Sequence, residues 1–275
     1  VLAKHRDELE GNVVFIHQHA EELTPGGAKP MIEDGCLDGV DVIFGSHLDS
    51  MSPSGHIKYR EGYIMAASDG FEITISGKGG HGAAPHDTVD PLVTASQLVT
   101  NLQQIVSRNV DPVKSAVLTI GSFHSGDANN VIPDTAKITG TVRTYDPEVR
   151  ELIQKRMKQV ADATCLANGA TCEVVYELGY DAVWNHPKET QYIQKVAEDL
   201  VGNDKMIEMP PEMGGEDFGY YMQKVPGTFF FTGAAPTNPD LVYPHHHPRF
   251  DFDEDAMLTT AKIFVSAVVN VNQEN

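Results

Sequence analysis

A short apolar run near the start of the chain ends in histidines and an adjacent pair of carboxylates: Val13-Val14-Phe15-Ile16-His17-Gln18-His19-Ala20-Glu21-Glu22. The apolar part predicts a buried strand over residues 12–17. Successive side chains of an extended segment point to opposite faces, so Glu21 and Glu22 can serve different tasks. One carboxylate can bind a metal ion while the other accepts a proton. Such a pair alone is more commonly a solvated surface feature, so its interpretation depends on the rest of the chain.

The segments after this run alternate between helix and strand. A short helix is expected at 28–34 and a second apolar strand at 40–45. Alternation of nearly continuous apolar strands with helices predicts an α/β domain with a mostly parallel sheet. Open sheets of this kind bind ligands beyond the carboxyl ends of their strands. We therefore expect His47, which follows the second strand, to lie near the glutamate pair.

The middle of the chain has a different pattern. Strands are expected at 71–76, 116–123, 136–145 and 171–178, and helices at 89–109 and 147–168. This β-α-β-β-α-β order is the ferredoxin-like split motif. The α/β pattern then returns, with helices at 189–201, 216–223 and 253–271 and a strand at 228–232. We predict a discontinuous α/β catalytic domain over 1–66 and 179–275, with a ferredoxin-like α+β domain inserted over 67–178.

Composition excludes several classes of protein. The chain has 275 residues, 41% of them hydrophobic, which is enough for one large or two ordinary domains. Its formal net charge of -19 argues against a nucleic-acid partner. No apolar stretch approaches the roughly 20 residues that span a bilayer, and we expect a cytoplasmic protein. The cysteines Cys36, Cys165 and Cys172 have no C-x-x-C spacing and are expected to be free thiols.

A histidine cluster lies near the C-terminus, at His245-His246-His247-Pro248. Imidazole beside a rigid proline, in a chain that already offers Glu22 and His47, favours at least one metal ligand here. The acidic residues at 253–255 are explained by a simpler role, since carboxylates at a helix N-terminus accept hydrogen bonds from free N–H groups.

Other polar motifs have equally simple explanations when each is taken alone. The segment Gly79-Gly80-His81-Gly82 is a flexible turn in which a histidine can approach a substrate, and it lacks the Lys-Ser/Thr of a phosphate loop. Asparagine commonly supports a turn, as in Asn130-Val131-Ile132-Pro133, and arginine is commonly exposed on a strand, as in Gly140-Thr141-Val142-Arg143.

Taken together, the motifs resemble one group of enzymes along nearly the whole chain. They are Gln18-His19-Ala20-Glu21-Glu22, Gly26-Gly27-Ala28, Gly79-Gly80-His81-Gly82, Asn130-Val131-Ile132-Pro133, Gly140-Thr141-Val142-Arg143, Met213-Gly214-Gly215-Glu216-Asp217-Phe218 and His246-His247-Pro248-Arg249-Phe250. The group is the amidohydrolase branch of the co-catalytic dinuclear metallopeptidases, which includes aminoacylase-like, hippurate hydrolase and auxin-conjugate hydrolase enzymes. The resemblance implies a zinc-peptidase-like catalytic domain with an inserted dimerisation or lid domain.

The resemblance also implies roles for individual residues. Glu21 is similar to the general base of the group, and the metal ligands would be Glu22, His47 and His246. The substrate-side residues would be His81, Asn130 and Arg143, with His81 reaching into the partner subunit's site. Two divalent ions, Zn, Mn, Co or Ni, would activate water for attack on the amide.

One departure from the group concerns the metal site. The resemblance implies two further ligands, a bridging cysteine and a histidine two positions later, from a Cys-Gly-His-Asp type motif upstream of the glutamate pair. Neither Cys36, Cys165 nor Cys172 stands in such a context. We expect that segment to precede Val1, and hence weak or absent metal binding and little activity by this polypeptide alone.

The expected function is metal-dependent hydrolysis of the amide bond of N-acyl amino acids by a homodimeric enzyme with small-molecule substrates. One alternative is a dipeptidase or carboxypeptidase of the same group. Another is a shortened, non-catalytic protein that dimerises through the inserted domain or binds amino-acid-like ligands.

Overall fold

The computed structural model describes residues 1–271, and its contacts divide the chain into two compact units. Unit 1 combines Val1–Met65, Val183–Glu212 and the described residues from Glu216 onward. Unit 2 combines Ala66–Ala182 with Met213–Gly215. Unit 1 is therefore assembled from parts of the chain that lie before and after most of unit 2.

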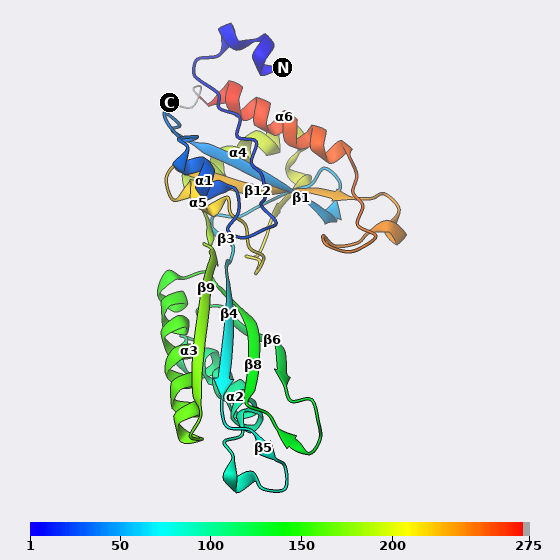
Figure 1. Ribbon diagram of the computed structural model, residues 1–275. Coiled ribbons are helices and arrows are strands. Elements are labelled where there is room, and N and C mark those ends of the chain that lie inside the picture. Colours follow the sequence, from blue (N-terminus) through cyan, green and yellow to red (C-terminus); the bar gives the residue numbers. More distant parts are fainter. Residues whose placement is uncertain (272–275) are drawn as a thin grey trace. The chain divides into compact units, whose positions relative to one another are not determined.

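Unit 1 is built on a mixed sheet of four strands in the order β1-β12-β2-β11 (Figure 1). These are β1 (Ile43–Pro53), β12 (Gly227–Ala235), β2 (Ile57–Tyr59) and β11 (Met206–Glu208). The pairs β1–β12 and β2–β11 are parallel, whereas β12–β2 is antiparallel. A separate antiparallel pair joins β3 (Gly62–Met65) to β10 (Val183–Asn185).

Two amphipathic helices bury one face of this sheet. They are α4 (Pro187–Val201) and α6 (Asp255–Asn270), and with the sheet they enclose a core that includes Ile57, Ile193, Phe230 and Ile263. Alternate residues of a strand point to opposite faces, so the neighbours of Phe230 on β12, Phe229 and Phe231, face away from this core. The short helices α1 (Ala28–Glu33) and α5 (Gly219–Met222) also belong to unit 1.

The beginning of unit 1 differs from the sequence-based expectation. Residues 12–17 form no strand, and the side chain of Phe15 is 63% exposed. A strand needs a neighbour for its backbone hydrogen bonds, and within residues 1–271 β1 pairs with β12 alone. The second predicted strand begins later than expected, at Ile43, and continues to Pro53. His47 therefore lies within β1 rather than after a strand.

Unit 2 contains an antiparallel sheet in the order β6-β8-β4-β9 (Figure 1). Its elements are, in chain order, β4 (Ala67–Ser76), α2 (Pro91–Asn109), β6 (Ala116–Ser125), β8 (Thr135–Thr144), α3 (Pro147–Ala167) and β9 (Thr171–Tyr180). The predicted β-α-β-β-α-β order is confirmed. A small hairpin pairs β5 (Gly80–His81) with β7 (Val131–Ile132).

The two helices of unit 2 begin in the same way. The carboxylate of Asp90 accepts hydrogen bonds from the backbone at the start of α2, and that of Asp146 does so for α3. Each acidic residue is followed by proline, whose fixed φ suits the first helical position. Both helices pack on the face of the sheet that carries Ile73 and Ile138, and their shared core is continuous.

A buried ion-pair network surrounds Asp69, near the N-terminal end of strand β4. Asp69 is 3% exposed and accepts hydrogen bonds from Arg150, from the hydroxyl of Tyr176 at 2.8 Å and from the backbone N–H of Gly179 at 3.0 Å. Arg150 also pairs with Asp181. These contacts join β4, α3 and β9, and they compensate for the loss of hydration of a buried charge.

We expect Asp69→Ala to destabilise unit 2 by about 3 kcal/mol, because it leaves Arg150 and Tyr176 without their buried acceptor. Urea unfolding with a matched Glu72→Ala control measures the effect. Glu72 pairs with Lys137 at 2.6 Å, but both side chains are at least 41% exposed, so this loss should cost less than about 1 kcal/mol. Equal costs for the two variants would contradict the importance given to the Asp69 network.

The structure also bears on membrane insertion and on the thiols. Within residues 1–271 no helix is long and apolar enough to cross a bilayer. Cys36, Cys165 and Cys172 are free, with Cys165 buried and the other two half-buried, as predicted.

Candidate functional site

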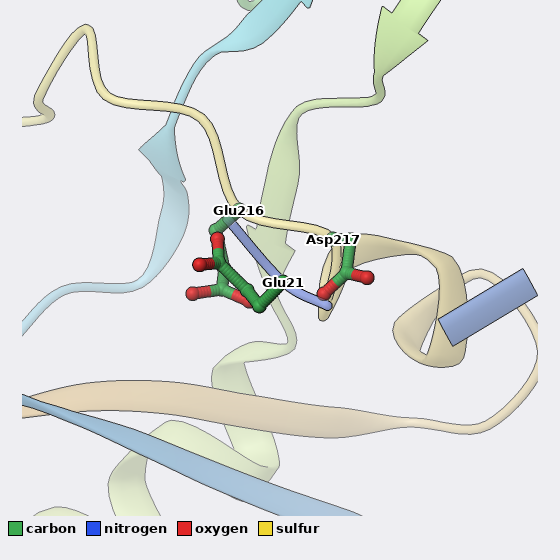
Figure 2. A group of neighbouring side chains, drawn as sticks. All are labelled: Glu21, Glu216 and Asp217. Carbon is green, nitrogen blue, oxygen red and sulfur yellow. The ribbon is translucent and has the colours of Figure 1, made fainter. Parts of the chain in front are cut away.

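The glutamate pair lies in unit 1 on a loop between the N-terminal segment and α1. Ala20, directly before the pair, has a φ of 55°, a left-handed conformation that residues with a side chain seldom adopt. Three carboxyl groups meet here: Glu21, Glu216 and Asp217 each offer an oxygen, and these oxygens lie within 4.8 Å of one another. Figure 2 shows that Glu216 and Asp217 come from one segment and Glu21 from another.

Both carboxylate oxygens of Asp217 accept hydrogen bonds. The side-chain amide of Gln18 donates to both of them, at 2.7 and 2.8 Å, and the N–H of Ala28 donates to Oδ2 at 3.0 Å. A carboxylate held in this way is a structural acceptor rather than an open metal ligand. The surroundings of Glu21 and Glu216 change the pKa of both carboxyl groups.

Both glutamates hold a proton more tightly than an ordinary carboxyl group. Burial raises the pKa of Glu216 to about 8, and the neighbouring charge of Glu21 adds to the effect, although the N–H of Phe218 opposes it. The pKa of Glu21 is also raised, first by burial and then by the charges of Glu22 and Asp217. His47 and His246 both act in the opposite direction on Glu21, which places both imidazoles near this carboxyl group.

Replacing Glu216 by glutamine should change how the free energy of unfolding depends on pH. Between about pH 4.5 and 8 the folded state keeps a proton on Glu216 that the unfolded chain has released, so the free energy of unfolding falls as pH rises through that window. In Glu216→Gln this loss, of the order of a few kcal/mol, should disappear. Urea unfolding at pH 5 and 8.5 with metal chelated measures it. Glu33 is exposed and serves as the control. If Glu33→Gln also lost the fall in stability between pH 5 and 8.5, the assignment of that fall to Glu216 would be contradicted.

His47 is fixed by its position in β1. It lies opposite Phe231 in the parallel register with β12, on the sheet face away from α4 and α6. Its Nδ1–H donates to the carbonyl oxygen of Leu48 at 2.6 Å. This hydrogen bond leaves Nε2 as the nitrogen for a ligand. The ring of His245 packs edge-on against it, with centroids 4.8 Å apart.

His246 follows in a loop held by ring contacts. Tyr243 stacks on His247 with centroids 4.4 Å apart, and the guanidinium of Arg249 lies 4.3 Å from the Tyr243 ring centroid. His246 itself has a φ of 67°. Its Nε2 lies 3.5 Å from Oε2 of Glu22. The structure thus brings Glu21, Glu22, His47 and His246 together in unit 1.

The predicted substrate-side residues belong to unit 2. His81 lies on β5, where its Nδ1 accepts the N–H of Ala83 at 3.0 Å, and the carbonyl oxygen of Asn130 accepts the N–H of Gly82 at 2.8 Å. Arg143 lies on β8, where its guanidinium contacts the hydroxyl of Thr141. Partial burial lowers the pKa of Arg143. Their roles stay predictions.

Sequence reasoning missed Glu216 and Asp217 as site residues. The segment Met213-Gly214-Gly215-Glu216-Asp217-Phe218 contributes only to the resemblance. A signal was nevertheless present, since a pair of adjacent carboxylates occurs within a few residues of a pair of glycines both here and at Glu21-Glu22 with Gly26-Gly27.

Comparisons with known proteins agree on one family. The sequence pattern of Peptidase family M20/M25/M40 matches residues 1–270. YhaA of Bacillus subtilis (strain 168) is 52% identical over 99% of this chain and 69% of its own length. Thermostable carboxypeptidase 1 of Saccharolobus solfataricus is 40% identical over 94% of this chain and 65% of its own. N-acetyl-L-cysteine deacetylase of Bacillus subtilis (strain 168) is 40% identical, over 94% and 60%.

Solved structures also match the chain over nearly its whole length. A protein of methicillin-resistant Staphylococcus aureus has a TM-score of 0.88 and 39% identity, covering 98% of this chain and 69% of that one. The YXEP protein of Bacillus subtilis, a dinuclear metal-binding peptidase from the M20 family, has a TM-score of 0.81 and 34% identity, covering 99% and 68%. The chain thus spans between 60% and 69% of the length of these relatives.

Proposed function

Because the chain belongs to Peptidase family M20/M25/M40, a family of metallopeptidases and amidohydrolases, we propose that the complete protein is a metal-dependent amidohydrolase that cleaves N-acyl amino acids. The resemblance recognised from the sequence is confirmed at the level of the family. The N-acyl amino acid as substrate is our proposal, and the deacetylase among the relatives supports it.

One observation carries the proposal: Glu21, a partly buried carboxyl group, lies among Glu22, His47 and His246. Two ligands at about 2.0–2.2 Å from a tetrahedral ion lie about 3.3–3.6 Å apart. The separation of 3.5 Å between Glu22 Oε2 and His246 Nε2 fits that spacing. Carboxylate and imidazole donors suit divalent zinc, manganese, cobalt and nickel, so the residues fit the proposed metals.

The chain's own residues would supply the proton transfers and the orientation. When bound, two divalent ions would lower the pKa of water and polarise the amide carbonyl. Glu22, His47 and His246 would be among the residues that hold them, and Leu48 would fix the tautomer of His47. Glu21 would take the proton from the attacking water and pass it to the leaving amine, a task for which its raised pKa is suited.

Unit 2 would contribute to substrate binding. Arg143 can pair with the free carboxylate of an N-acyl amino acid, and Asn130 can donate hydrogen bonds to it. His81, on its small hairpin, would stabilise the oxyanion in the site of the partner subunit. We therefore also propose that unit 2 is the inserted dimerisation domain that its ferredoxin-like order suggests.

Exposed apolar groups on unit 2 support association between two copies. Strand β6 forms one edge of the sheet and exposes Phe123, and Leu92 and Val93 are exposed on α2. An edge strand is a common place for chains to pair, and exposed apolar side chains often mark an interaction surface. Light scattering should give the mass of a dimer, and a monomer for Phe123→Lys. A monomeric wild-type protein would exclude this part of the proposal.

The second candidate is a peptidase that removes an amino acid from a peptide, because a carboxypeptidase is among the relatives. Comparing kcat/KM of the metal-loaded complete protein for an N-acetyl amino acid and for a dipeptide with the same C-terminal residue separates the two. The proposal predicts preference for the acetyl compound. Preference for the dipeptide would favour the peptidase, and turnover of neither would favour a non-catalytic protein that dimerises or binds amino-acid-like ligands.

A further inference from the structure

We propose that Asp217 is a positioning residue that fixes both ends of the loop carrying Glu21 and Glu22. The inference rests on the proposed function, since it concerns the alignment of the proposed base and metal ligand. Asp217 would not touch the substrate or the metal. It would act by holding the backbone from residue 18 to residue 28 in one conformation.

The hydrogen bonds of Asp217 lie on both sides of the glutamate pair. Gln18, before the pair, donates from Nε2 to Oδ1 at 2.7 Å and to Oδ2 at 2.8 Å. Ala28, after the pair, donates its backbone N–H to Oδ2 at 3.0 Å. Asp217 is fully buried at 0% exposure. One rigid carboxylate therefore ties the beginning of the loop to its end.

The loop packs so tightly that two of its positions have no room for a side chain. Gly26 has a φ of +80°, and a Cβ added there would lie 2.1 Å from Asp217 Oδ2. A Cβ added at Gly27 would lie 2.0 Å from the carbonyl oxygen of His19. Both distances are far below van der Waals contact. Gly26 thus allows the backbone to pass close to Asp217, and Gly27 allows the two ends of the loop to approach each other.

The donors also explain why a carboxylate can be buried beside other acids. Burying a charge is costly unless hydrogen bonds replace its hydration. Asp217 receives three such bonds while Glu21 and Glu216 lie within 4.8 Å. These acceptor positions are filled by N–H groups, which favours a positioning role over direct metal binding. Displacing a reacting group by about 1 Å can cost about 100-fold in rate, so this anchoring would matter for turnover.

Three substitutions in the complete protein test the inference, with one matched control. Asp217→Ala removes all three hydrogen bonds. Asp217→Asn keeps one acceptor oxygen for Ala28, and Gln18 can turn its amide to accept from the new NH₂ group. Gln18→Leu removes only the bonds before the pair, so it keeps the test informative if Asp217→Ala fails to fold.

The control is Asn185→Ala, also in unit 1. Asn185 is 0% exposed and donates from Nδ2 to the carbonyl oxygens of Arg60 and Phe229, at 2.9 and 2.7 Å. It should destabilise unit 1 as Asp217→Ala does, without releasing the loop. Hydrogen exchange of residues 18–28, Mn²⁺ affinity by calorimetry, and kcat and KM are measured for each variant.

We expect faster exchange across 18–28 in Asp217→Ala, a kcat lowered about 100-fold with KM within about threefold, and Mn²⁺ affinity lowered about tenfold. Gln18→Leu should lower kcat about tenfold, and Asp217→Asn should restore most of the activity. Unchanged exchange and kcat in Asp217→Ala, or an equal fall in Asn185→Ala, would overturn the inference. If the wild type turns over no substrate, the proposed function fails, and exchange in 18–28 alone decides: faster in Asp217→Ala than in Asn185→Ala supports the inference, and equal rates overturn it.

Discussion

Replacing Glu21 by glutamine is expected to lower kcat of the complete protein by about 10²- to 10⁴-fold, because an amide cannot accept the proton of water. Glutamine matches glutamate in shape, and the proposed ligands Glu22, His47 and His246 remain. The metal content should therefore stay unchanged. Turnover of an N-acetyl amino acid and elemental analysis of the purified variant give the two quantities.

An exposed carboxyl group serves as the control for Glu21. Glu254→Gln makes the same chemical change on the surface before α6 and should leave turnover and metal content at wild-type values. If Glu21→Gln instead loses its metal, Glu21 is a ligand and the assignment of base and ligand within the pair is wrong. If the variant keeps its turnover, another group accepts the proton.

Replacing His246 by alanine is expected to weaken metal binding more than about 100-fold, since loss of a group that merely orients a ligand already costs about 10- to 100-fold. The imidazole lies 3.5 Å from Glu22, and its removal leaves that carboxylate without its partner at the site. Calorimetric titration with Mn²⁺ or Zn²⁺ measures the affinity. Activity should return in part when the metal concentration is raised.

A surface histidine controls for the change at His246. His5 Nδ1 lies 2.9 Å from Oε1 of Glu8, and both side chains are more than half exposed. His5→Ala should bind metal like the wild type. Wild-type affinity in His246→Ala would remove this residue from the proposed ligand set and leave the Glu22 contact as an ordinary surface ion pair.

The part of the fold that could be predicted from sequence is the part with local signals. In unit 2, periodic apolar residues such as Leu98 and Leu102 mark α2, and Asp90 with Pro91 marks its start. The short strands β2 and β11 could not be predicted, because three residues carry too little periodicity. The strand expected at 12–17 shows the converse limit: apolar residues favour a strand, but a sheet partner decides whether it forms.

The candidate site, like the fold, could be predicted only where its signals are local in the sequence. Glu21 and Glu22 are adjacent in the sequence, so their pairing is visible there. Glu216 and Asp217 lie far along the chain, and only the fold brings them to Glu21. The raised pKa of Glu216 depends on its burial, and the hold of Asp217 on Gln18 depends on tertiary contact. No local pattern contains either property.

The most direct measurement of the central claim is the metal dependence of amide hydrolysis. The complete protein, loaded with Mn²⁺ or Zn²⁺, is incubated with a series of N-acetyl amino acids, and the released acetate and amino acid are quantified before EDTA treatment, after it, and after metal is restored. The account predicts equal release of both products, loss of turnover with EDTA and its return with metal. Hydrolysis that persists at full rate with the metal removed, or no hydrolysis of any acetylated amino acid by the metal-loaded protein, would contradict it.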